Sequence, residues 1–109
     1  MGESPFLIKI DEIFIYLCYY KQRNNIGEIR MFKILVVEDN ANVRRLMQVV
    51  LKQNGFEPIL AENAMKALSI LDEEYVDLII LDIMMPGMDG FELTREIRES
   101  KMNMPILMV

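Results

Sequence analysis

The stretch DLIILDIMMPGMDG, residues 77–90, combines a strand pattern with an acidic end and a turn. After Asp77, its next four residues, LIIL, are apolar on both faces of an extended chain. That pattern is typical of a central parallel strand that helices cover on both sides. Asp82 follows this strand directly, and Met-Met-Pro-Gly then predicts a turn. An acidic residue therefore stands at the carboxyl end of a buried strand.

Strand and helix patterns alternate on both sides of this stretch. Predicted strands cover 33–37, 56–60, 77–81 and a last apolar run after Pro105, and predicted helices contain 43–51, 64–71 and 90–100. Short connections between them predict a doubly wound α/β sheet with right-handed crossovers. Pro58 cannot donate a ladder hydrogen bond, so the second strand should lie at an edge of the sheet.

Composition limits the kinds of function. A chain of 109 residues that is 52% hydrophobic suits one small core. The net charge of −5 disfavours direct binding to nucleic acid or to an anionic membrane. With one cysteine and no histidine, thiolate or imidazole metal sites are nearly excluded. The chemistry must therefore rest on carboxylates, hydroxyls, lysine and backbone groups.

Residues 1–30 differ from the rest of the chain. They are neutral overall, whereas residues 31–109 carry the whole net charge of −5. Their central part fits a helix or a strand equally well. The apolar run Ile13–Tyr20 is too short for a membrane span of about 20 residues, and the cytoplasm is the expected location.

One hypothesis is that Met31 is the natural start. The DNA that encodes GEIRM can contain a bacterial ribosome-binding sequence at a suitable distance before the ATG codon of Met31. On this hypothesis residues 1–30 are translated upstream sequence. N-terminal sequencing tests this, and a native chain that begins at Met1 would refute it. The alternative is a leader helix that covers exposed core.

The strand ends gather acidic residues. Glu38-Asp39 ends the first strand and Asp82 ends the third, and ligands of doubly wound sheets bind at this edge. Adjacent carboxylates repel by roughly 4 kcal/mol at 4 Å, so a cluster calls for raised pKa values or a cation. Oxygen ligands suit Mg²⁺, which would bring a phosphoryl group to Asp82 as nucleophile. Taken singly, each residue could instead form a turn or complement a helix dipole.

The motifs KILVVEDNANVRRLMQVVL, AENAMKAL and DLIILDIMMPGMDGFELTREIRE, with the final MPILMV, closely resemble the receiver domain of bacterial response regulators. The resemblance covers residues 31–109 and implies a flavodoxin-like doubly wound parallel sheet, truncated to about four strands and three helices. It implies a signalling domain rather than an enzyme, with a sensor histidine kinase as partner. By position, Asp82 would be the phosphoacceptor. Asp39 and Asp82 would bind Mg²⁺ directly, Glu38 through water, and Met84 through its backbone carbonyl.

The sequence departs from the receiver pattern at two places. Ala64 stands where receivers often have glycine, a change that favours the helix. After Val109, receivers continue with a Thr or Ser, a fifth strand ending in Lys, and further helices. Lys101 falls at the wrong end of the sheet to replace that Lys. The expectation is an exposed fourth-strand edge, low stability and possible self-association. A monomeric, cooperatively melting sample of residues 31–109 would contradict it.

The residues are also compatible with other functions. A receiver fragment with poor phosphorylation and a pure interaction module both fit the residues. A phosphatase of the haloacid dehalogenase type is disfavoured because Met84 stands where a second aspartate is needed. A flavin mononucleotide carrier is disfavoured because Glu38-Asp39 would repel a phosphate. A small phosphodonor with Mg²⁺ separates the first two readings.

Overall fold

The structure is a computed structural model, and it describes residues 15, 17–19, 22–23, 31–82, 90–100 and 104–108. The chain divides into two units, Met1–Met31 and Phe32–Val109. In the first unit the described residues before Met31 are helical, which decides between the two forms that the sequence left open. The Arg23 guanidinium donates a 3.1 Å hydrogen bond to the Tyr19 hydroxyl there. Among the described helices, none has the length and apolar character that crossing a membrane requires.

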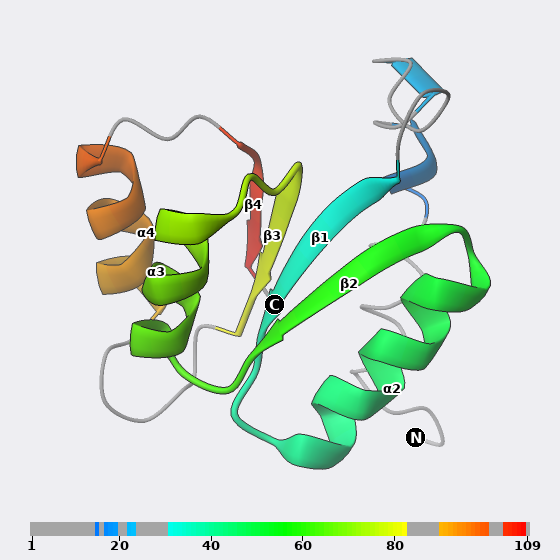
Figure 1. The fold of residues 1–109 in the computed structure, drawn as a ribbon, viewed down its shortest axis with the longest axis horizontal. Helices are drawn as coiled ribbons and strands as arrows, with labels where there is room; N and C mark the ends of the chain where they lie inside the picture. The colour runs from blue at the N-terminus through cyan, green and yellow to red at the C-terminus, as the bar shows by residue number, and fades with distance from the viewer. Residues whose placement is uncertain are drawn as a thin grey trace, which may run out of the picture. The chain divides into compact units, whose positions relative to one another are not determined.

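The second unit is built around one parallel sheet. Its strands are β1 (Phe32–Val37), β2 (Phe56–Ala61), β3 (Leu78–Leu81) and β4 (Ile106–Met108), and its helices are α2 (Ala41–Gln53), α3 (Ala64–Glu73) and α4 (Gly90–Glu99). All pairings are parallel and the order is β2-β1-β3-β4 (Figure 1). The predicted flavodoxin-like sheet of four strands and three helices is therefore confirmed for this unit, and β2 with Pro58 lies at an edge as expected. At the other edge, β3 is the only strand paired with β4 in the described sheet, and self-association there stays a prediction.

Helices cover both faces of this sheet. Helix α2 lies on one face, and α3 and α4 lie together on the other (Figure 1). Alternate strand residues point to opposite faces, so a strand that is apolar throughout can be buried on both. On the face under α3 and α4 the core consists of Leu35, Val37, Ala61, Ala64, Ala67, Leu71, Val76, Ile79, Leu81, Leu93 and Ile97. The intervening residues Ile34, Val36, Leu78 and Ile80 are also buried, which explains the unbroken LIIL of β3.

Asparagines start two of the helices. The Asn40 side chain accepts a 3.0 Å hydrogen bond from the Val43 amide at the start of α2. Asn63 accepts a 2.8 Å hydrogen bond from the Lys66 amide at the start of α3. Such caps satisfy amides that have no partner inside the helix. Helix α2 ends before Gly55, whose φ of 85° lies in the left-handed region that favours glycine. The two asparagines therefore set where α2 and α3 begin, and Gly55 allows the turn that leads from α2 into β2.

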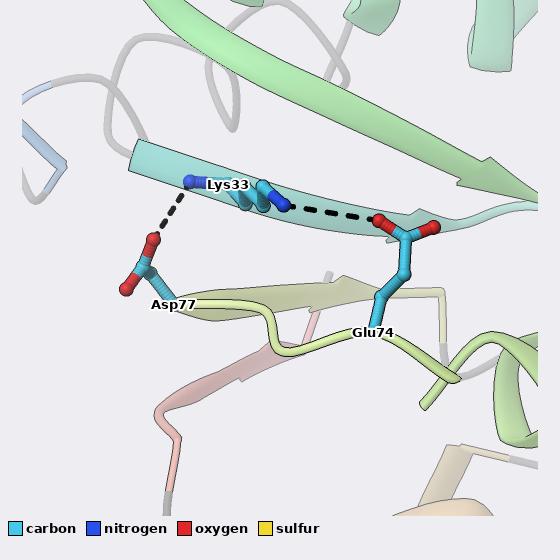
Figure 2. Close-up of polar contacts among 3 residues, drawn as sticks. All are labelled: Lys33, Glu74 and Asp77. Carbon is cyan, nitrogen blue, oxygen red and sulfur yellow. Dashed lines mark hydrogen bonds and ion pairs between the residues drawn. The ribbon is translucent and has the colours of Figure 1, made fainter. Parts of the chain in front are cut away.

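A buried carboxylate joins the starts of β1 and β3. Asp77 is only 2% exposed, and its Oδ2 accepts a 2.8 Å hydrogen bond from the Lys33 amide. The Asp77 amide in turn donates to the Lys33 carbonyl at 2.8 Å. Figure 2 shows this contact beside a second one, in which Lys33 Nζ lies 3.9 Å from Glu74 Oε1. The Asp77 carboxylate therefore fixes the register of β1 against β3 at the amino-terminal ends of the strands, opposite the carboxyl ends where the predicted site lies.

We expect Asp77→Ala to lower the free energy of unfolding by about 1 to 3 kcal/mol, because it leaves the partly buried Lys33 amide without its acceptor. Asp77→Asn, which keeps an acceptor oxygen, should cost less. Glu74→Ala is the matched control, since it breaks only a half-exposed ion pair and should cost less than about 0.5 kcal/mol. Urea denaturation measures all three variants. Equal losses for Asp77→Ala and Glu74→Ala would contradict this role.

Candidate phosphoryl and metal site

The acidic residues predicted from the sequence leave the sheet at neighbouring strand ends. Val37 and Leu81 are paired as the last residues of β1 and β3, and Glu38 and Asp82 follow them directly. The Asp82 amide donates to the Val37 carbonyl at 3.1 Å, and the Glu38 amide donates to the Ala61 carbonyl at 3.0 Å. These bonds extend the ladder past the strands. The backbone of Glu38 and of Asp82 is thereby held where the winding of the sheet reverses.

The side chains form one cluster. Glu38, Asp39 and Asp82 each offer a carboxylate oxygen, and these oxygens all lie within 4.8 Å of one another. Glu38 is buried, Asp82 is half-buried and Asp39 is exposed. The structure therefore brings together the three carboxylates that the sequence placed at this edge. Met84, whose carbonyl was expected to complete the set, lies outside the described residues.

The loop between β1 and α2 is tied by contacts that the sequence reading missed. The Asn40 amide donates to Glu38 Oε2 at 3.2 Å. Arg44, in the first turn and a half of α2, donates from Nη1 to the carbonyl of Glu38 at 2.9 Å and to that of Asp39 at 3.3 Å. An arginine shortly after a helix cap is long enough to reach back over the first turn, and that spacing is the only sequence signal for these contacts.

Burial and charge act together on Glu38. The residue is 7% exposed, and its pKa is raised from the ordinary value of 4.5 to about 7. Desolvation is the largest cause of this shift, the neighbouring Asp82 and Asp39 also raise the pKa, and the hydrogen bond from the Asn40 amide lowers it. Such a shift means that ionising this carboxyl costs more free energy in the folded protein than in the unfolded chain. A cation at the cluster would remove much of that cost.

The raised pKa of Glu38 predicts a pH dependence of stability. The folded state holds the Glu38 proton more tightly than the unfolded chain does. The stability that the protonated carboxyl contributes is therefore complete below pH 4.5 and is lost as pH rises through about 7. Glu38→Gln keeps an acceptor for the Asn40 amide but cannot ionise. In the absence of metal, we expect the free energy of unfolding of Glu38→Gln, relative to that of the wild type, to rise by about 1 to 3 kcal/mol across that pH window. Urea denaturation at several pH values measures the difference.

The control is Glu99→Gln, which removes an exposed glutamate at the end of α4. Its stability should run parallel to that of the wild type over the same pH range. If Glu38→Gln also ran parallel to the wild type, burial of Glu38 beside two other carboxylates would not govern its ionisation.

The cluster has the donor set of a hard cation. Mg²⁺ takes oxygen ligands, and proteins usually hold it by one or two carboxylates, with water and phosphate oxygens filling the other positions. Here Asp39 is exposed and Asp82 is half-buried, so both can be reached by such ligands, and Glu38 adds a third, buried carboxyl. Histidine is absent from the chain and the single cysteine, Cys18, lies in the other unit. The residues present therefore fit Mg²⁺ better than a softer metal.

Comparison with known families decides the class of this domain. A family model described as the response regulator receiver domain matches residues 34–109. The chain belongs to this family. Receiver domains are signalling modules of two-component systems, so the resemblance inferred from the motifs around Asp82 is confirmed. The acidic cluster of this receiver lies inside the matched region.

Known regulators share this receiver sequence. It is 47% identical over 77 residues to the transcriptional regulatory protein ResD of Bacillus subtilis, covering 71% of this chain and 32% of ResD. It is 40% identical over 79 residues to the phosphate regulon transcriptional regulatory protein PhoB of Escherichia coli, covering 71% of this chain and 34% of PhoB. The chain thus spans about a third of the length of these curated relatives.

Solved receivers share the fold. The response regulator TrrA of Thermotoga maritima in complex with Mg²⁺ and BeF is 43% identical, with a TM-score of 0.66 over 70% of this chain and 66% of that one. TrrA in complex with the histidine kinase ThkA gives 42% identity and a TM-score of 0.67, over 72% and 67%. The chemotaxis protein CheY4 of Vibrio cholerae gives 34% identity and a TM-score of 0.69, over 72% and 67%. The order β2-β1-β3-β4 is therefore the receiver order.

Proposed function

We propose that this receiver accepts a phosphoryl group on Asp82 from a sensor histidine kinase, with Mg²⁺ as cofactor. The observation that supports this most is the meeting of three carboxylate oxygens within 4.8 Å at the ends of β1 and β3. Such a concentration of charge is costly without a cation and is useful when a phosphoryl group must be brought to an aspartate. The similarity to TrrA, whose complexes contain Mg²⁺ with BeF or a histidine kinase, supports the cofactor and the partner.

Within this proposal each residue takes the role that the resemblance to receivers implies. The half-buried Asp82 is the nucleophile, and its carboxylate oxygen forms a bond to phosphorus as the bond between phosphorus and the donor's imidazole nitrogen breaks. The released imidazole nitrogen takes up a proton. When bound, Mg²⁺ supplies positive charge that offsets the charges of the carboxylate and phosphoryl oxygens. Asp39 and Asp82 would bind it directly, Glu38 through water, and Met84 through its carbonyl.

The wider setting is part of the same proposal. The domain would act in the cytoplasm, as bacterial response regulators do, and signal rather than catalyse a metabolic reaction. The net charge of −5 argues against direct binding of nucleic acid by these 109 residues. Transcriptional regulation is a property named for the longer relatives ResD and PhoB, which this chain matches over about a third of their length.

A chemical phosphodonor tests the proposal. The 109-residue protein is incubated with Mg²⁺ and acetyl phosphate, in which the aspartate displaces acetate, and intact mass is measured. We expect one added phosphoryl group that requires Mg²⁺ and is removed by hydroxylamine, as an acyl phosphate should be. A folded protein that gains no such group at any donor concentration would refute the proposal and favour an interaction module.

A further inference from the structure

The Arg44 side chain binds the backbone that carries two of the clustered carboxylates. Its Nη1 lies 2.9 Å from the Glu38 carbonyl oxygen and 3.3 Å from the Asp39 carbonyl oxygen. One guanidinium nitrogen carries two hydrogens, so it can donate to both carbonyls at once. The arginine is half-buried, whereas its neighbour Arg45 is exposed. These contacts set Arg44 apart from the other cations of α2.

The contacts fall where the backbone leaves the sheet. The Glu38 amide is still held by the Ala61 carbonyl at 3.0 Å, but Asp39 lies one residue beyond that ladder bond. Helix α2 begins at Ala41, after the Asn40 cap. Arg44, whose own amide donates to the Asn40 carbonyl at 2.9 Å, is fixed in the helix and reaches back to the peptides before it. Its side chain therefore connects a rigid helix to the carbonyls of two cluster residues.

We propose that Arg44 is a positioning residue for the site: it holds the Glu38–Asp39 backbone so that both carboxylates are preset for Mg²⁺. This inference rests on the proposed function. A flexible exposed carboxylate must lose freedom when it binds a metal, and a tethered backbone removes part of that loss in advance. Groups that orient metal ligands in this way typically change metal affinity by about 10- to 100-fold.

The positive charge of Arg44 acts in the opposite direction. A cation near the cluster repels Mg²⁺, so if charge dominated, removing Arg44 would tighten binding. Water and salt screen that repulsion, and the guanidinium donates its hydrogen bonds to the backbone carbonyl oxygens of Glu38 and Asp39. Geometry should therefore outweigh charge. Replacement of the exposed Arg45 removes the same charge from the adjacent position without removing these contacts.

The test compares the full chain with Arg44→Met, Arg44→Lys and the control Arg45→Met, each shown to be folded by circular dichroism. Calorimetric titration gives the dissociation constant for Mg²⁺, and hydrogen exchange without metal follows the Asn40 amide, which donates to Glu38 Oε2. We expect Arg44→Met to bind Mg²⁺ about tenfold more weakly and to exchange this amide faster. Arg44→Lys keeps the charge but not the planar fork, and should also bind more weakly. Arg45→Met should stay within about twofold of the wild type.

Phosphorylation separates positioning from chemistry. At saturating Mg²⁺, Arg44→Met should still accept a phosphoryl group from acetyl phosphate, because Asp82 is intact. Equal Mg²⁺ affinity in Arg44→Met and wild type, or tighter binding in the variant, would overturn this inference and leave the proposed function standing. A wild-type chain that binds no Mg²⁺ would overturn both.

Discussion

Asp82→Asn is expected to abolish phosphorylation of the protein by acetyl phosphate. The amide of asparagine is a poor nucleophile, and Glu38 and Asp39 leave from a different strand, so neither replaces Asp82 at the end of β3. The same substitution removes one of three carboxylates whose oxygens lie within 4.8 Å. At a pH above about 7, where Glu38 is ionised as well, the variant without metal should therefore be more stable than the wild type, by roughly 1 to 2 kcal/mol. Intact mass and urea denaturation measure the two effects.

The matched control for Asp82→Asn is Asp72→Asn, which changes an exposed aspartate of α3. That variant should be phosphorylated to the wild-type level and should melt as the wild type does. Undiminished phosphorylation of Asp82→Asn would show that another residue accepts the group. A loss of stability in Asp82→Asn would show that the clustered carboxylates do not repel one another in the metal-free fold.

Asp39→Asn is expected to weaken Mg²⁺ binding by about 100-fold. Asp39 is the exposed member of the cluster, so replacing it removes a charged ligand without opening the core. An ion pair at contact distance near a protein surface is worth several kcal/mol before the loss of hydration is counted, and a net loss of about 2.7 kcal/mol corresponds to this factor. Calorimetric titration with Mg²⁺ measures it directly.

Glu62→Gln is the control for Asp39→Asn. Glu62 is exposed and follows β2 at the same edge of the sheet, so the variant changes the net charge equally without altering the cluster. Its Mg²⁺ affinity should stay within about twofold of the wild type. Similar losses in both variants would mean that general electrostatic attraction, and not ligation by Asp39, accounts for binding.

Much of the fold could be predicted because the signals are local. The apolar run of β3, the helical spacing in α2 and α3, and the Asn54-Gly55 stop each report on a few adjacent residues. The proximity of Glu38 and Asp82 then followed from one rule: the carboxyl ends of parallel strands lie on the same side of the sheet. Pro58 placed β2 at the outside for a similarly local reason.

The missed features depend on pairings between distant segments. The sequence marked Asp77 only as the first residue of a strand, whereas the structure buries it against the Lys33 amide, 44 residues away. The contacts of Arg44 depend on the path of the backbone between β1 and α2, which no periodicity describes. The raised pKa of Glu38 likewise depends on its burial beside Asp82. Propensity and pattern find elements, but side-chain contacts need the assembled fold.

Locating the phosphoryl group tests the assignment of Asp82 as phosphoacceptor most directly. Protein treated with Mg²⁺ and acetyl phosphate is reduced with borohydride, which converts an aspartyl phosphate to homoserine, and its peptides are sequenced by mass spectrometry. We predict homoserine at position 82 and unchanged residues at Asp39 and Glu38. Conversion at position 39 or 38, or none at 82 in protein that has gained the group, would contradict it.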